Sequence, residues 1–239
     1  TKHPTCLTTI RVPIMKSGIV AEKVNNKWVG LGPALIEDLF KDTNCKYQFI
    51  EMPLARAWLS LQNGEVDLLP VSPDSPEREK FAFVFTLFNS QYGFGYLKPW
   101  TADNLNKAIS EGRANIGIIR SNLPITKLDP VLKNYPSSKL MTINEIPTLL
   151  LLLKEGRIDT IYSHPYLFLN AIIDMKLQNE WSVLVRPNSP AMKLCSFLSK
   201  QMNANDAAIV RALLEDYIAK GKHWKILEQS IGPSMTRKM

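Results

Sequence analysis

Apolar residues recur along this chain with two periods, one typical of short buried strands and one typical of amphipathic helices. Short runs rich in β-branched, aromatic or aliphatic residues predict strands at 8–14, 46–51, 66–69, 91–97, 114–119, 139–141, 158–162, 181–185 and 192–199. Apolar residues three or four positions apart predict helices at 32–41, 53–62, 102–111, 123–134, 143–155, 165–175, 205–219 and 224–230. Because strands alternate with helices, we expect an α/β fold of mostly parallel sheets with helices on both faces.

One seven-residue pattern occurs in each half of the chain. Residues 61–67 (LQNGEVD) and 153–159 (LKEGRID) both read L-x-x-G-x-[V/I]-D. In each copy a helix ends, a glycine caps it, and a short strand carries an Asp at its second position. The repeat favours two α/β lobes of related construction. Two ordinary connections between a helix and a strand are the alternative, because glycine caps are common.

Polar side chains that could bind an anion follow three of the predicted strands. Open α/β sheets bind ligands beyond the carboxyl ends of their strands, where the free N–H groups of helix N-termini also lie. The candidates at these strand ends are Ser72, Arg78, Arg120, Ser121, Tyr162 and His164. The two arginines, one from each half of the chain, could hold a carboxylate through bidentate hydrogen bonds.

Each of these side chains also has a purely structural explanation. Arg78 lies between two glutamates, so local ion pairs on a solvated turn would account for it. Arg120 directly follows an apolar strand, where surface arginines are common, and His164 could simply begin a helix. Tyr162 and Trp28 could line a pocket, but core packing is the commoner fate of both residue types.

The composition bounds the class of protein. A chain of 239 residues is long enough for one large domain or two small ones, and no apolar run approaches the roughly 20 residues that span a bilayer. The net charge of +7 comes from scattered basic residues, without the Arg/Lys runs and interleaved aromatics of a nucleic-acid surface. This charge indicates only a weak preference for small anionic ligands. The chain begins Thr-Lys-His-Pro rather than with Met, and we expect a signal peptide to have been removed.

Three cysteines bear on the redox compartment and on metal binding. None of Cys6, Cys45 and Cys195 belongs to a C-x-x-C pair, and only three histidines are present, so we expect no metal site. Cys6 precedes the first predicted strand and Cys45 the second. If those strands are neighbours, a disulfide could join their starts in an oxidising compartment; three unrelated apolar thiols are the alternative. Cys195 lies in an apolar run and is expected to pack as a small hydrophobic residue.

Signatures of catalysis are poor in this sequence, although acid–base chemistry by a Glu or Asp stays open. It contains no G-x-S-x-G elbow, no H-E-x-x-H motif, no glycine-rich phosphate loop and no G-x-G-x-x-G fingerprint. We therefore expect neither an enzyme nor a bound cofactor.

Three segments, in this order, resemble a known family. They are 28–39 (WVGLGPALIEDL), 61–68 (LQNGEVDL) and 75–80 (SPEREK), and the likeness extends from end to end of the chain. Together they resemble the extracellular solute-binding proteins of family 3, the periplasmic amino-acid-binding proteins of ABC transporters. That resemblance implies the type II periplasmic-binding-protein fold, a two-lobed clamp that closes on its ligand about two hinge crossings.

The resemblance also implies a domain organisation and a ligand contact. Lobe 1 would comprise residues 1–97 and 186–239, and lobe 2 would comprise residues 98–185. The ligand would bind between the lobes, with the guanidinium of Arg78 holding its carboxylate. The protein would be a periplasmic or secreted monomer without a cofactor. It would meet a membrane permease or receptor only transiently and would bind no nucleic acid.

Several residues depart from the family's pattern. Residues 70–73 (PVSP) stand where the family often has A-G-x-T, so Pro73 offers no backbone N–H. The acidic residue that usually binds the ligand's ammonium group falls at or next to His164 and is missing. Arg56, beside the position where the family often stacks an aromatic ring, would add a positive charge, and Leu54 is a further candidate contact. These departures favour an anionic ligand without a strong requirement for an ammonium group.

The leading hypothesis is a solute-binding protein that captures a small polar, carboxylate-bearing ligand for an ABC-type transporter. The same lobes could instead form the ligand-sensing domain of a receptor. A dehydratase-like enzyme on this scaffold, using a carboxylate in the cleft, is a third hypothesis. Fold alone does not choose among them.

Overall fold

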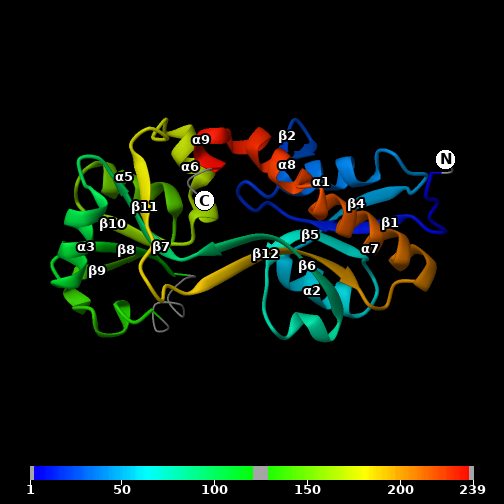
Figure 1. The fold of residues 1–239 in the computed structure, drawn as a ribbon, viewed down its shortest axis with the longest axis horizontal. Helices are drawn as coiled ribbons and strands as arrows, with labels where there is room; N and C mark the ends of the chain where they lie inside the picture. Colours follow the sequence, from blue (N-terminus) through cyan, green and yellow to red (C-terminus); the bar gives the residue numbers. More distant parts are fainter. Residues whose placement is uncertain (1–2, 121–128, 237–239) are drawn as a thin grey trace. The chain divides into compact units, whose positions relative to one another are not determined.

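The computed structural model describes residues 3–120 and 129–236, and the chain divides into two compact units. Unit 1 is Thr1–Asn89 with Lys193–Gly232, and unit 2 is Ser90–Met192 with Pro233–Met239. In Figure 1 the blue to cyan first part of the chain and the gold to red residues 193–232 belong to unit 1, and residues 90–192, green to yellow, belong to unit 2. The chain therefore leaves unit 1, builds most of unit 2 and then returns.

Unit 1 contains parallel and antiparallel strand pairs together with helices. Its strands are β1 (Ile10–Ile14), β2 (Glu22–Val24), β3 (Lys27–Val29), β4 (Tyr47–Glu51), β5 (Leu68–Pro73), β6 (Ala82–Gln91) and β12 (Ala191–Ser199). Its helices are α1 (Leu31–Phe40), α2 (Leu54–Gln62), α7 (Ala204–Ala219) and α8 (Lys222–Ile231). β1 and β4 are parallel, β5 and β12 are antiparallel, β12 also lies beside β6, and β2 forms a hairpin with β3. The last residues of β6 and the first of β12 fall in unit 2, so these two strands carry the chain across.

Unit 2 is built around a sheet of mixed direction. Among the described residues its strand order is β11 (Trp181–Leu184), β7 (Gly93–Leu97), β10 (Thr160–Ser163), β8 (Ile116–Ile119) and β9 (Leu140–Ile143). The accompanying helices are α3 (Ala102–Ser110), α5 (Ile146–Lys154), α6 (Leu169–Asp174) and α9 (Pro233–Thr236). β8 is parallel to β9 and β10, whereas β7 is antiparallel to β10 and β11.

The expected α/β architecture is present, but the expectation of mostly parallel sheets is wrong. Alternation of strands and helices predicts parallel pairing for strands joined by a crossover helix, and β8, β9 and β10 follow this rule. β7 and β12 are not reached through a crossover helix within one sheet. β7 follows β6 where the chain enters unit 2, and β12 carries the chain back to unit 1. Both of these strands pair antiparallel with their described neighbours β10, β11 and β5.

Several elements differ from the predicted ones. The sequence did not indicate the β2–β3 hairpin, most of strand β6, or helix α9. Residues 121–128 of the predicted helix at 123–134 lie outside the described residues, and the rest contains a 3-10 turn at Leu132–Asn134. The predicted helix at 165–175 is divided into a 3-10 turn at Pro165–Leu167 and α6.

The boundaries of the units also differ from the predicted lobe boundaries after residues 97 and 185. β7 belongs to unit 2, because it pairs there with β10 and β11. Arg186 lies in unit 2 as well, since its Nη1 group donates to Asn106 Oδ1 on α3 at 2.8 Å. The chain therefore crosses between the units after Asn89, near the end of β6, and after Met192, near the start of β12.

The seven-residue repeat has the same local structure in both units. Gly64 and Gly156 have φ values of +72° and +70°, in the left-handed region that glycine adopts most easily. After each glycine, an aspartate exchanges two hydrogen bonds with one residue of the preceding segment: its N–H donates to a carbonyl, and its carboxylate accepts an N–H. These pairs are Asp67 with Arg11 and Asp159 with Asn115. The repeat thus specifies how a helix end joins the neighbouring strand in each unit.

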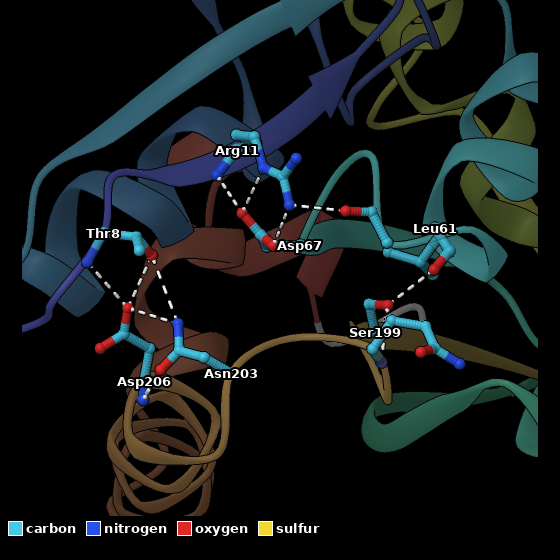
Figure 2. Close-up of polar contacts among 9 residues, drawn as sticks. Thr8, Arg11, Leu61, Asp67, Ser199, Asn203 and Asp206 are labelled. Carbon is cyan, nitrogen blue, oxygen red and sulfur yellow. Dashed lines mark hydrogen bonds and ion pairs between the residues drawn. The ribbon is translucent and has the colours of Figure 1, made fainter.

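Asp67 joins three segments of unit 1 (Figure 2). Its carboxylate accepts the backbone N–H of Arg11 at 2.8 Å and the Arg11 Nε and Nη2 groups at 3.0 and 2.8 Å. Its own N–H donates to the Arg11 carbonyl, and its carbonyl accepts the N–H of Ser199, both at 2.8 Å. Because Asp67 is only 3% exposed, these bonds satisfy a buried charge while they hold β1, β5 and β12 together.

Asp206 ties the N-terminal segment to α7 (Figure 2). Its carboxylate accepts the backbone N–H of Leu7 at 2.7 Å. It also accepts the backbone N–H and the hydroxyl of Thr8, at 3.0 and 2.7 Å. Asn203, the N-cap of α7, accepts the Asp206 N–H at 2.9 Å and donates back to the carboxylate at 3.0 Å. Burial would raise the pKa of Asp206, but these hydrogen bonds outweigh burial and hold the pKa below its usual range.

Cys6 and Cys45 form a disulfide, so the predicted pairing is confirmed. β1 and β4, the strands that follow these cysteines, lie side by side with Ile10 opposite Tyr47. The starts of both strands are therefore adjacent, as the pairing requires. Cys195 is a free cysteine and is buried, which agrees with its expected role as a small hydrophobic residue.

The Asp67 network predicts a large loss of stability for Asp67→Asn. The amide would place an NH2 group against the donors of Arg11 and leave a positive charge without its partner. Breaking a buried ion pair costs about 3–5 kcal/mol. Because the Arg11 side chain is 39% exposed, we expect a loss of about 2 kcal/mol in the free energy of unfolding by urea. Glu51→Gln is the control, because it removes the exposed Lys23–Glu51 pair and should change stability by less than about 0.5 kcal/mol. Equal effects of the two substitutions would contradict the role given to Asp67.

The Asp206 network predicts a specific loss of stability in acid. A carboxyl group with a lowered pKa in the folded protein stabilises the fold at every pH above its unfolded pKa, which is about 3.9 for Asp. That contribution decreases as the pH falls below about 4, since protonation first favours the unfolded chain. Thermal melts between pH 3 and 7 should therefore show a smaller loss of Tm in acid for Asp206→Asn than for the wild type. Parallel pH profiles for the two proteins would refute the prediction.

Candidate functional site

The connection between β5 and β6 holds Arg78 against an aromatic surface of unit 1. The guanidinium carbon lies 3.7 Å from the centroid of the Trp58 ring and 5.7 Å from that of Phe197. These two rings meet edge to face with centroids 4.9 Å apart, and both belong to the apolar core formed around Leu61 and Cys195. A guanidinium stacked on an aromatic face keeps its edge and its N–H donors directed to the side, where a planar anion can meet them.

Pro73, Pro76 and a 3-10 turn determine the path of the backbone between β5 and β6. Pro73 ends β5, and the Arg78 N–H donates to the Ser75 carbonyl at 3.0 Å, at the start of the turn Arg78–Lys80. The side chain then folds back, and Arg78 Nη1 donates to the carbonyl of Pro73. Pro73 has no N–H to offer a ligand, but its carbonyl fixes the guanidinium from one side.

Ion pairing with the flanking glutamates does not account for the position of Arg78. Burial lowers the pKa of Arg78, while the nearby carboxylate of Asp74 acts to raise it. Among the ion pairs of the described chain, none joins Arg78 to Glu77 or Glu79. The turn therefore presents a partly desolvated guanidinium that contacts two aromatic rings and the carbonyl of Pro73.

Ser72 and Cys195 lie behind this turn. They are opposite each other in the antiparallel pair of β5 and β12, and their exposures are 5% and 0%. Cys195 Sγ contacts Thr86 Oγ1 at 3.7 Å, and burial raises the pKa of its thiol to about 11. A buried thiol with a raised pKa is a poor nucleophile, so Cys195 packs the site and does not provide chemistry.

Arg56 and Leu54 lie at the start of α2, the helix that also carries Trp58. Arg56 is exposed and pairs with Glu65, with Nη2 and Oε2 at 2.7 Å. Since residues two apart on a helix do not share a face, Arg56 points away from the face of Trp58. Leu54 is 41% exposed and, four residues before Trp58, shares its face. The third positive charge expected from Arg56 is thus engaged by a carboxylate of the protein itself.

Tyr162 is a core residue of unit 2. Its side chain is fully buried, and its hydroxyl donates to Asp129 Oδ2 at 3.0 Å. Asp129 also accepts the N–H of Val131 at 2.9 Å. Burial and the adjacent Asp129 raise the pKa of Tyr162 well above its usual range. The core-packing alternative therefore accounts for this residue.

His164 lies directly after β10, at the start of the 3-10 turn Pro165–Leu167. Its ring meets that of Tyr92 edge to face at 5.6 Å. Within the described residues its Nδ1 atom is buried and has no hydrogen-bond partner. Burial lowers the pKa of His164 to about 4, so the imidazole is neutral at physiological pH. A neutral ring cannot replace an acidic residue as the partner of an ammonium group by charge.

Arg120 and Ser121 follow β8 in unit 2. Arg120 is exposed, and its Nε group donates to Asn144 Oδ1 at 2.7 Å. Ser121 lies outside the described residues. The prediction that Arg78 and Arg120 bind one anion together stays a prediction.

Sequence reasoning missed the residues that fix Arg78. Trp58 and Phe197 stand 139 positions apart (197 − 58), and neither belongs to a recognisable motif. A weak signal for Trp58 was its place one helical turn after Leu54 on α2. Phe197 gave no signal, because β12 reaches this place only by returning from unit 2.

Neither a metal site nor a membrane-spanning helix is found in the parts of the chain that the structure describes. There, no three His, Cys, Asp or Glu side chains are grouped so that they could hold an ion. Every described helix is also too short or too polar to cross a bilayer.

The environment of His164 predicts an unusual titration. The ring should stay neutral until the pH falls to about 4, because protonation requires a charge in an apolar surrounding. Long-range ¹H–¹⁵N spectra across pH 3–8 would measure the midpoint, and His164→Gln would assign the signal. Between about pH 6.5 and 4 the unfolded chain binds a proton that the folded chain does not, so this residue lowers stability as the pH falls. A midpoint near the ordinary value of 6.5 would show that the ring is solvated.

The comparisons with known proteins concern the fold of the whole chain. No protein-family model and no curated protein matches the sequence. An ancestral cationic amino acid solute-binding protein has a similar solved structure, with a TM-score of 0.72 and 17% identity over 93% of this chain and 95% of that one. A polar amino acid ABC uptake transporter substrate-binding protein from Streptococcus thermophilus gives a TM-score of 0.69 and 12% identity, covering 96% of this chain and 89% of that one.

A receptor module is also among the similar structures. The GluR0 ligand-binding core in complex with L-glutamate gives a TM-score of 0.63 and 12% identity, with 94% of this chain and 99% of that one covered. These likenesses extend over both units, and they confirm the fold that the sequence motifs implied. The chain has the two-unit α/β fold of the type II periplasmic binding proteins.

Proposed function

We propose that this protein is a secreted or periplasmic solute-binding protein that captures a small polar ligand by its carboxylate and supplies it to an ABC-type transporter. The observation that carries the proposal is the setting of Arg78. A guanidinium has five N–H donors, and within the described residues the hydrogen bond of Arg78 goes to the Pro73 carbonyl. The donors that remain lie on a planar group already fixed by Trp58.

The partial burial of Arg78 gives this site its strength. A carboxylate that binds a guanidinium away from bulk water gains more than the same pair gains on an open surface. The aromatic stacking lowers the conformational entropy that a long side chain would otherwise lose on binding. Partial burial and aromatic stacking therefore favour a role of Arg78 in binding a ligand carboxylate over a role in an exposed ion pair of the protein.

The similar structures support this class of function. Two of them are named as amino acid solute-binding or substrate-binding proteins, and these are binding proteins rather than enzymes. The buried thiol of Cys195, with its raised pKa, agrees with a binding role. His164, Arg120 and Ser121 are further candidate contacts, and their part in ligand binding remains a prediction.

A ligand-sensing domain of a receptor is the second candidate. The similarity to the GluR0 ligand-binding core favours it, because that structure binds L-glutamate with the same fold. The Arg78 site would serve either role without change. A neighbouring gene for a permease or for a receptor would distinguish the two.

Replacement of Arg78 tests the carboxylate site. A thermal-shift screen of amino acids, organic acids and short peptides first identifies a compound that raises the Tm, since a ligand that binds only the folded state stabilises it. Calorimetry should then show binding weaker by at least about tenfold for Arg78→Ala, or roughly 1.4 kcal/mol. Arg78→Lys should lie in between, because lysine keeps the charge but not the planar fork.

Arg211→Ala is the matched control for this experiment. Arg211 also stacks on an aromatic ring of unit 1, with its guanidinium carbon 4.2 Å from the Phe83 centroid, but it belongs to α7. Binding should therefore be unchanged in this variant. Equal affinities of the wild type and Arg78→Ala would refute the proposed site.

A further inference from the structure

We infer that Asp74 recognises a cationic group of the ligand, so that the connection between β5 and β6 provides partners for both a carboxylate and an amine. This inference rests on the function proposed above and adds the charge of the ligand to it. It assigns the role to a residue that neither the sequence motifs nor the resemblance singled out.

Asp74 is held next to the Arg78 guanidinium by the backbone. Arg78 Nη1 donates to the carbonyl of Pro73, the residue directly before Asp74. The N–H of Asp74 donates to the carbonyl of Lys193 on β12 at 2.9 Å. The start of the turn is therefore anchored both to the guanidinium and to the neighbouring strand, which keeps Asp74 in place.

The carboxylate of Asp74 has hydrogen-bonding capacity that the described chain does not use. Its Oδ1 atom is buried and has no partner among the described residues, and Asp74 forms no ion pair there. Buried polar atoms in folded proteins nearly always have a partner, and an exception often marks a functional site. Asp74 also acts by charge, since it raises the pKa of Arg78 and of Cys195.

Arg78 and Asp74 together present a positive and a negative charge on one turn. A ligand with only a carboxylate would pair with Arg78 but would also be repelled by Asp74. A ligand that carries an amine near its carboxylate would satisfy both. The charge of Asp74 acts over several ångströms in a partly buried site, so it favours the amine even without direct contact with Oδ1.

This inference differs from the ligand class that the sequence favoured. The absence of an acidic residue at His164 suggested a ligand without a strong requirement for an ammonium group. In the structure, His164 is indeed neutral, but a carboxylate is present in unit 1 beside Arg78. The acidic partner thus comes from the same turn as the arginine.

The experiment compares ligands that differ only in the amine. The probes are L-arginine, L-glutamine and L-glutamate, each paired with its des-amino carboxylic acid, and binding is measured by calorimetry. We expect at least one amino acid to bind the wild type about tenfold or more tightly than its des-amino counterpart. In Asp74→Asn this preference should shrink to less than about threefold, because amine binding weakens and the repulsion of the plain acid is removed.

Glu79→Gln is the control, because it removes one negative charge from the same turn at an exposed residue. It should keep the wild-type preference. Asp74→Ser removes the charge with a smaller side chain and replaces Asp74→Asn as the test if that variant does not fold. Circular dichroism and Tm establish the folded state of each variant.

The outcomes separate this inference from the proposed function. An unchanged preference for the amine in a folded Asp74 variant, with binding still lost in Arg78→Ala, would overturn the role of Asp74 and keep the carboxylate site. Tighter binding of the des-amino acids to the wild type would also overturn it. If none of the six probes binds the wild type, the inference is overturned, whereas the carboxylate site is still tested by the wider thermal-shift screen and by Arg78→Ala.

Discussion

The buried carboxylate of Asp67 is the interaction on which the frame of unit 1 depends. Its side chain and backbone bind Arg11 on β1, and its carbonyl binds Ser199 at the end of β12. These strands come from the first and the last part of the chain, and residues 90–192 between those parts belong to unit 2. Asp67 therefore joins the two separate parts of the chain that make up unit 1. A buried charge in this position is stabilised because both carboxylate oxygens accept N–H groups of Arg11.

The candidate site is an extension of the same frame. β5 begins one residue after Asp67 and ends at Pro73, and β12 brings Phe197 beside it. The Arg78 turn therefore starts from the strand that Asp67 fixes and rests on the ring that the returning strand supplies. A loop built on paired strands can hold a guanidinium in one orientation, and preorganisation of this kind reduces what a ligand must order on binding.

The two units differ in the chemistry they can offer a ligand. Unit 1 presents a stacked guanidinium and a carboxylate without a described partner, which suit a molecule that carries both charges. In unit 2 the predicted residue Tyr162 is used by the core, and the imidazole of His164 is neutral. The charged candidates are therefore Arg78 and Asp74 in unit 1 and the exposed Arg120 in unit 2.

The sequence by itself determined the local elements and the chemistry of the turn. Helix and strand periods, the glycine-capped repeat and the order of motifs depend on neighbouring residues, so they predicted the α/β class, the repeated connection and Arg78. The pairing of Cys6 with Cys45 was open in the sequence, because it required β1 and β4 to be neighbours. Only the tertiary structure decided which distant residues meet: the antiparallel return of β12, the Trp58–Phe197 surface under Arg78, and the burial of Asp74 Oδ1. Such contacts depend on long-range packing and desolvation, which no local pattern in the sequence encodes.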